Sequence, residues 1–238
     1  MKRVYVTVLL LVFMLVPAIN ASAGLITQTQ AFGPQIPNFD TDLRFNQFDS
    51  ALGTLQSIKV QLDLTTSGGS LGVDNDGTQQ AIVDVRLGSQ GRISSSQVGL
   101  VDQDFQPVFG FVEAYESATF VLAADNGDGS GNVDESGPDG AKLSGGTASS
   151  SGSGFIASAA FGQYIGTGVF DITASVNQVL DFGGVGGVEG CFSNMAAEGS
   201  VTIIYDYEPS FPSVPVPGAF VLLFSGLIGL AGIKRNKA

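Results

Sequence analysis

The chain has 238 residues, with 10 Lys and Arg against 22 Asp and Glu, and it contains no His and no Trp. A net charge of −12 argues against nucleic-acid binding, because phosphate groups bind to clustered Lys and Arg. Without His, the chain lacks the usual general base and the commonest transition-metal ligand, so it cannot build a Ser–His or Cys–His catalytic pair.

The first 23 residues have the pattern of a secretory signal peptide. Lys2 and Arg3 give a positive start, an apolar run follows, and Ala21 and Ala23 complete a small-x-small cleavage site. We therefore expect export through the Sec translocon and a mature protein that begins near Gly24.

Residues 24–209 predict one exported domain. They carry 5 basic and 22 acidic residues, a net charge of −17, which suits a domain that stays soluble or binds cations. The single cysteine, Cys191, allows no intrachain disulfide, so stability must come from a packed core.

The clearest strand pattern in this domain is the alternation of 58–64. Its apolar residues share one face, and Lys59, Gln61 and Asp63 share the other. Similar alternation occurs at 81–87, 155–161 and 201–207, and further strands are expected at 25–31, 109–114, 119–123 and 168–175. Many short strands separated by Gly, Asn and Asp predict an all-β fold, an antiparallel β-sandwich of the jelly-roll type.

The segment 125–154 interrupts this rhythm. It is rich in Gly, Ser and Asp and has almost no large apolar residue, so the sequence predicts a long acidic surface loop.

Within this segment, one run of residues is spaced like the calcium-binding loop of an EF-hand. The candidate ligands are Asn126, Asp128, Ser130, Asn132 and Asp134. Gly137 stands where the bidentate Glu belongs, so the hypothesis is a weak Ca²⁺ site, and a plain acidic loop is the alternative. A second run, 74–77, is a weaker candidate and is also explained as a hairpin turn with Gly77 at positive φ.

Paired carboxylates are the remaining catalytic candidates. Glu113 with Glu116, or Asp102 with Asp104, would have to face each other across a cleft to hydrolyse a glycoside. We interpret them instead as outward-facing residues and predict no enzymatic activity. Cys191 has no His to activate it, so it is expected in the core or a loop.

Residues 210–238 combine three chemistries in a fixed order. Pro215 and Pro217 force an extended, protease-accessible strip. The apolar run 218–233 is predicted to form a short transmembrane helix, about 24 Å long against a hydrocarbon core of about 30 Å. Lys234 and Arg235 then begin a basic end, 234–238, that should stay cytoplasmic. A buried core helix is the alternative for this run.

This order of proline motif (214–217), apolar run and basic end resembles the PEP-CTERM sorting signals of Gram-negative bacteria. The resemblance implies that a membrane-embedded exosortase recognises Pro215 and Pro217 and cuts near them. Val216 stands where an acidic residue is often found. The family is associated with exopolysaccharide and biofilm production.

The domain itself resembles the choice-of-anchor E family of β-rich extracytoplasmic proteins. The resemblance rests on short motifs at 26–30, 32–34, 45–49, 52–55, 164–168 and 201–207. It implies no reaction and no residue roles.

Together these features predict an exported protein that is tethered to the inner membrane before processing. It would then reach the cell surface or the extracellular matrix of a Gram-negative bacterium, in a structural or adhesive role. A calcium-assisted polysaccharide-binding module is a second hypothesis, and an enzyme acting on matrix glycans is a third.

Overall fold

The computed structural model describes residues 23–127, 133–184 and 186–210. Within these ranges, the chain forms nine strands, one 3₁₀ turn and one short helix. In chain order they are β1 (Gly24–Gln35), β2 (Phe39–Asn46), β3 (Gly53–Asn75), β4 (Ala81–Ser94), β5 (Val112–Leu122), β6 (Gly140–Ser144), β7 (Thr147–Phe155), the 3₁₀ turn (Ser158–Ala160), α2 (Phe161–Tyr164), β8 (Val169–Asp181) and β9 (Val188–Pro209). The all-β prediction is confirmed.

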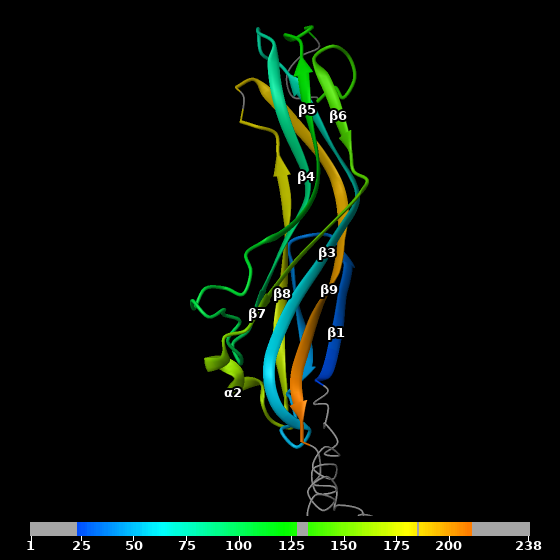
Figure 1. Ribbon diagram of the computed structural model, residues 1–238. Helices are drawn as coiled ribbons and strands as arrows, with labels where there is room; N and C mark the ends of the chain where they lie inside the picture. Colours follow the sequence, from blue (N-terminus) through cyan, green and yellow to red (C-terminus); the bar gives the residue numbers. More distant parts are fainter. Residues whose placement is uncertain (1–22, 128–132, 185, 211–238) are drawn as a thin grey trace, which may run out of the picture.

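The strands form two antiparallel sheets that face each other (Figure 1). The first sheet has the order β1-β9-β3-β6, and β7 pairs with β3 along the same edge as β6. The second sheet has the order β2-β8-β4-β5. The chain crosses between the sheets after β1, β2, β3, β5, β7 and β8. The predicted antiparallel sandwich is therefore confirmed.

The longest ladder joins β3 to β9 and sets the length of the domain. It runs from the pair Gly53 and Pro209 to the pair Asn75 and Val188. A ladder of more than 20 residues spans about 70 Å at about 3.3 Å per residue, so the domain is elongated (Figure 1).

The two ends of the described chain lie at the same end of this long ladder. Gly24, which begins β1, pairs with Tyr207 near the end of β9. We call this end the terminal pole. At the opposite end, which we call the distal pole, lie the turn 76–80 and the described residues of two further connections, 182–187 and the one between β5 and β6 (Figure 1).

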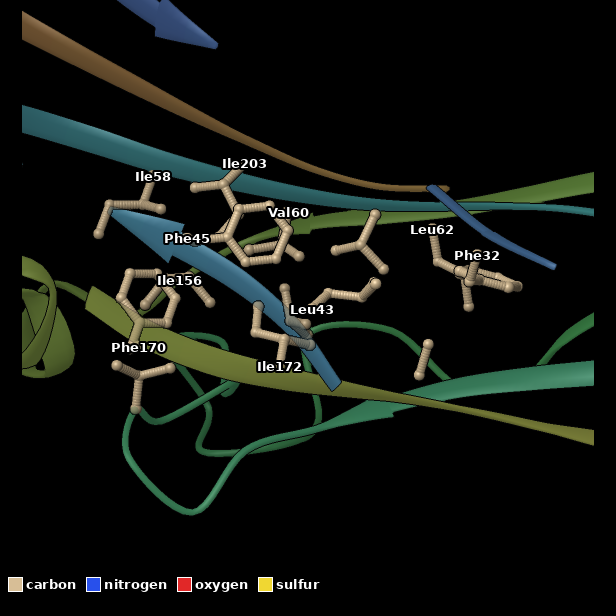
Figure 2. Packing of buried hydrophobic residues seen from close by; sticks show 14 of the residues in the cluster. Phe32, Leu43, Phe45, Ile58, Val60, Leu62, Ile156, Phe170, Ile172 and Ile203 are labelled. Carbon is tan, nitrogen blue, oxygen red and sulfur yellow. The ribbon is translucent and has the colours of Figure 1, made fainter. Parts of the chain in front are cut away.

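The main core lies between the two sheets (Figure 2), and its β3 and β9 residues come from the half of the β3–β9 ladder nearer the terminal pole. Ile58, Val60, Leu62 and Leu64 all point into it and are at most 1% exposed, as their alternation predicts. Burying side chains of this size contributes about 1.5–3 kcal/mol each, which makes this cluster the main source of stability.

A second, smaller cluster fills the half nearer the distal pole. It includes Leu71 and Val73 from β3 with Val83 and Val85 from β4. Between the clusters, the buried hydroxyls of Thr66 and Ser89 form a hydrogen bond with each other. Because each hydroxyl has a partner, this polar pair crosses the core at little cost.

The strand predicted at 155–161 is wrong. β7 ends at Phe155, and the chain then turns through the 3₁₀ turn into α2. A helical turn places Ala160 and Tyr164, four residues apart, on one face, and both are buried against the core. The tyrosine hydroxyl donates a hydrogen bond to the carbonyl oxygen of Gly99 at 2.9 Å, so a tertiary contact overrides the local alternation.

The long surface loop predicted at 125–154 also needs correction, because it contains β6 and all but the last residue of β7. Here the absence of large side chains allows close packing of strands. A Cβ atom at Gly152 would lie 2.7 Å from Val112 Cγ2, and one at Gly154 would overlap the carbonyl oxygen of Val108. The small residues thus allow β7 to pair with β3 while Val108 and Val112 pack directly against its backbone. The two strands predicted at 109–114 and 119–123 are one strand, β5.

Candidate functional site at the distal pole

Backbone hydrogen bonds join the three connections of the distal pole into one unit. The amide of Asp76 donates to the carbonyl oxygen of Gly187 (2.8 Å), and that of Asp125 donates to the carbonyl oxygen of Gly77 (2.9 Å). Within the connection between β5 and β6, the amide of Ala123 donates to the carbonyl oxygen of Pro138 (2.8 Å). Each of these connections joins a strand of one sheet to a strand of the other, so the hydrogen bonds hold the two sheets together at this end of the sandwich.

Acidic side chains are concentrated at this pole. They are Asp74, Asp76, Asp125, Asp134, Glu135, Asp139, Asp181 and Glu189. Lys142 on β6 forms an ion pair with Glu135 and holds the pKa of that carboxyl below its usual range. The surplus of carboxylates produces a negative potential that favours cations over anionic partners.

Asn126, the first predicted calcium ligand, instead contacts a buried carboxylate. Its main-chain amide and its side-chain Nδ2 donate to the two oxygens of Asp139 at 2.7 and 2.9 Å. Asp139 is completely buried, and these charge-assisted bonds replace its lost hydration. Asp139 is a structural anchor that the sequence analysis missed, since nothing local separates it from the other acidic residues of the segment.

Asp134, the last predicted calcium ligand, is engaged with its own turn. Its Oδ1 accepts hydrogen bonds from the Ser136 hydroxyl (2.7 Å) and amide (2.8 Å), which lower the pKa of the Asp134 carboxyl. The other predicted ligands, Asp128, Ser130 and Asn132, lie outside the described residues. In the part of the chain that the structure describes, no three His, Cys, Asp or Glu side chains are close enough to hold a metal ion. The loop site stays a prediction.

The run 74–77 is not the hairpin turn that the sequence suggests. β3 continues through Asn75, and Gly77 is not at positive φ. The side chain of Asn75 is buried, donates to the carbonyl of Gln79 (2.8 Å) and accepts from the amide of Gly77 (3.1 Å). Beside it lies a hollow of about 310 Å³, lined by residues 75, 77–81 and 186.

The carboxylate pairs considered for catalysis do not face each other across a cleft. Glu113 and Glu116 are three positions apart on β5, so their side chains leave opposite faces of the strand. Asp102 Oδ1 accepts hydrogen bonds from the amides of Asp104 (2.9 Å) and Gln106 (3.0 Å), which fixes an exposed turn.

Cys191 lies on β9 beside Glu135. Its Sγ donates to Glu135 Oε1 at 3.5 Å, and burial together with that carboxylate raises the pKa of the thiol. A nucleophilic cysteine needs the opposite environment, one that stabilises the thiolate.

The residues predicted to direct export and sorting flank the described domain. Ala23 is exposed and directly precedes β1, whereas Ala21, Pro215, Pro217, Lys234 and Arg235 lie outside the described residues. Among the described residues, no helix has the length and apolar character that a membrane span requires. The apolar run 218–233, which is predicted to span the membrane, lies outside the described residues.

Comparisons with known proteins assign no family. No family model matches the chain, and no curated protein matches it. A chain from the structure of the infectious bursal disease virus Gx strain has 11% identity over 79% of this chain and 37% of its own, with a TM-score of 0.20. A VP2 subviral particle of infectious bursal disease virus has 14% identity over 90% of this chain and 50% of its own (TM-score 0.11). A chain of Desmodium yellow mottle tymovirus has 10% identity over 84% of this chain and 90% of its own, with a TM-score of 0.13.

This chain thus spans less than two thirds of the length of the first two of these structures. With TM-scores this low, none of the three similarities supports a statement about fold or function.

Proposed function

We propose that this chain is an exported protein that an exosortase system sorts to the cell surface or the extracellular matrix, where it has a structural or adhesive role. The observation that carries the proposal is the order of proline motif, apolar run and basic end in 214–238. That order begins a few residues after Pro209, where the last strand ends.

The arrangement of the domain supports this route. Both predicted processing sites flank the sandwich, because Gly24 begins the first strand and Pro209 ends the last. Proteases cut extended, unpaired chain far more readily than paired strands. Since Gly24 and Tyr207 are paired, a chain held by its C-terminal segment would extend the domain about 70 Å from its attachment point.

We further infer that the sandwich is a jelly roll. The support is the strand order, in which β1-β9-β3-β6 faces β2-β8-β4-β5 and the chain alternates between the sheets except between β4 and β5 and between β6 and β7. In such a fold, two Greek keys close the sandwich without a disulfide. A rigid, elongated body of this kind suits a structural role.

The sorting proposal is tested by intact-mass spectrometry of the protein made in its native host. We expect a chain that begins near Gly24 and lacks residues 218–238. A variant with both Pro215→Ala and Pro217→Ala should keep the C-terminal segment, because the recognised motif is gone. A wild-type protein that still carries 218–238 contradicts the proposal.

A calcium-assisted polysaccharide-binding module is the second candidate. The observation that favours it is the acidic distal pole on a domain of net charge −17, which repels anionic polysaccharide unless a divalent cation bridges the two. Sedimentation with an anionic exopolysaccharide should then require Ca²⁺ and be lost in chelator. Equal sedimentation with and without Ca²⁺ contradicts this candidate.

A further inference from the structure

The outer face of the first sheet brings two carboxylates together at the distal pole. In an antiparallel ladder, directly paired residues point to the same side. Asp74 on β3 is paired with Glu189 on β9 and, on its other side, with Gly140 on β6. The Cβ atoms of Asp74 and Glu189 are therefore about 4.5–5.5 Å apart, a spacing at which like charges destabilise the sheet.

Asp74 is only 2% exposed, and among the described residues only one of its carboxylate oxygens has a hydrogen-bond partner. Oδ2 accepts from the main-chain amide of Asp134 at 2.9 Å. Oδ1 is also buried, and it has no hydrogen-bond partner in the part of the chain that the structure describes. A charged oxygen removed from water without a partner is costly, which points to a ligand that satisfies it.

Main-chain oxygens lie beside Gly140, the residue paired with Asp74 on β6. Gly140, the neighbour of Asp74 on β6, has no side chain, and a Cβ atom there would overlap the carbonyl oxygen of Asp134. The same position lies 2.9 Å from the carbonyl oxygen of Ser136. The segment 133–139 thus contacts Asp74 through the amide of Asp134 and brings two carbonyl oxygens beside Gly140, the strand neighbour of Asp74.

We propose that these groups form a binding site for a divalent cation, Ca²⁺, that joins β3, β9 and the segment 133–139. Asp74 Oδ1 is the anchoring ligand, and the carboxylate of Glu189 and the carbonyl oxygens of Asp134 and Ser136 complete the set. Carboxylate and carbonyl oxygens in irregular geometry suit Ca²⁺, whereas Mg²⁺ demands a near-ideal octahedron.

This site differs from the loop pattern of 126–134, because it takes only a main-chain oxygen from that loop and its carboxylates come from the sheet. Two carboxylates are fewer than in high-affinity sites, so we expect a Kd in the range of about 10⁻⁴–10⁻³ M that extracellular modules show. The inference gives the second candidate function a cation site, and its test needs no polysaccharide and no sorting step.

The test is thermal unfolding of the purified full chain in a mild detergent, in chelator and in about 10 mM Ca²⁺ at matched ionic strength. We expect Ca²⁺ to raise the Tm of the wild type by about 3–6 °C. Asp74→Asn should abolish the shift. In chelator this variant should be at least as stable as the wild type, because its amide oxygen still accepts from Asp134 and its NH₂ group can donate to the carbonyl oxygens. A merely structural role for Asp74 predicts a lower Tm in both conditions.

A variant with Asp128→Asn and Asn132→Ala is the matched control and should keep the full shift, because neither side chain belongs to the proposed site. A shift that is lost in this control and kept in Asp74→Asn assigns Ca²⁺ to the loop and overturns the proposal, as does a wild type that Ca²⁺ does not stabilise. If Asp74→Asn does not fold, the proposal is tested by equilibrium dialysis, which compares Ca²⁺ binding by Glu189→Gln with that of the wild type. Several-fold weaker binding supports the site, and unchanged binding refutes it.

Discussion

Val60 on β3 lies directly opposite Ile203 on β9, and both side chains are completely buried between the two sheets (Figure 2). On its other side, Val60 pairs with Gly154 of β7. Val60 therefore lies at the centre of the first sheet, with a neighbouring strand on each side and the main core in front of it. Any polar group at this position has no route to water.

Val60→Asp should unfold the domain or come close to it. An unpaired carboxylate buried at this position costs several kcal/mol, against a total stability of about 5–15 kcal/mol for a typical domain. Urea unfolding of the purified full chain measures the loss. The matched control is Ser153→Asp, an exposed position on β7 opposite Gln61, which should cost less than about 1 kcal/mol. Equal midpoints for the two variants would show that the inner and outer faces are assigned wrongly.

Gly154→Ala should destabilise the protein, whereas Gly162→Ala should not. A Cβ atom at Gly154 would overlap the carbonyl oxygen of Val108, so the backbone has to move, at a cost of about 1–3 kcal/mol. At Gly162 in α2, no atom lies within 4 Å of the added methyl group, and alanine there stabilises by about 0.4–1 kcal/mol through the unfolded state. Urea unfolding of both variants checks the pair. If Gly154→Ala is as stable as Gly162→Ala, β7 does not pack against the main chain of Val108 as described.

The protein should lose stability above about pH 10. Burial raises the pKa of both Tyr164 and Tyr205 above the ordinary tyrosine value, so the folded state keeps two protons that the unfolded state releases. The contribution of these tyrosines to the free energy of unfolding is complete below the pKa of an unfolded tyrosine. It falls as pH rises from that value toward the raised folded-state pKa, by up to about 1.4 kcal/mol per pH unit for each tyrosine. Urea midpoints measured between about pH 8 and 11 test this slope.

Tyr205→Phe is the control for that slope. The hydroxyl of Tyr205 donates to the carbonyl oxygen of Asn46 at 3.0 Å, and this oxygen also accepts from Gln28 Nε2 at 2.9 Å. Because the carbonyl keeps one partner, the variant should lose only about 1 kcal/mol at neutral pH and show a shallower alkaline decline. An alkaline slope identical to that of the wild type would mean that Tyr205 does not contribute to it.

Cys191 should react slowly with thiol reagents at neutral pH. Burial and the Glu135 carboxylate raise the pKa of its thiol, which reduces the thiolate fraction. Glu135→Gln removes the neighbouring negative charge, so alkylation by iodoacetamide should become faster. Lys142→Gln should have the opposite effect or none, because it removes a nearby positive charge. Faster alkylation in Lys142→Gln than in Glu135→Gln would contradict this electrostatic account.

Much of the sandwich could be predicted because burial in a strand follows a local rule. Side chains alternate between two faces, so the runs 58–64 and 81–87 reveal their inner faces without knowledge of any partner. The same rule failed at 155–161, where the contact of Tyr164 with Gly99, far away in sequence, selects a helical turn. It also missed β6 and β7, since these strands are held by main-chain pairing with β3 and carry few apolar side chains of their own.

The sequence by itself therefore determined the all-β class, the inner face of the main strands and the acidic charge, because each depends on neighbouring residues or on composition. It also contains the linear patterns at both ends from which we propose export and sorting. Only the tertiary structure decided which carboxylates meet. Asp74, Glu189 and Gly140 come from three separate parts of the chain, and the register of β3 with β9 and β6 places them side by side. Strand pairing is a long-range choice, made by the fit of whole sheets, and no local pattern around any of these residues specifies it.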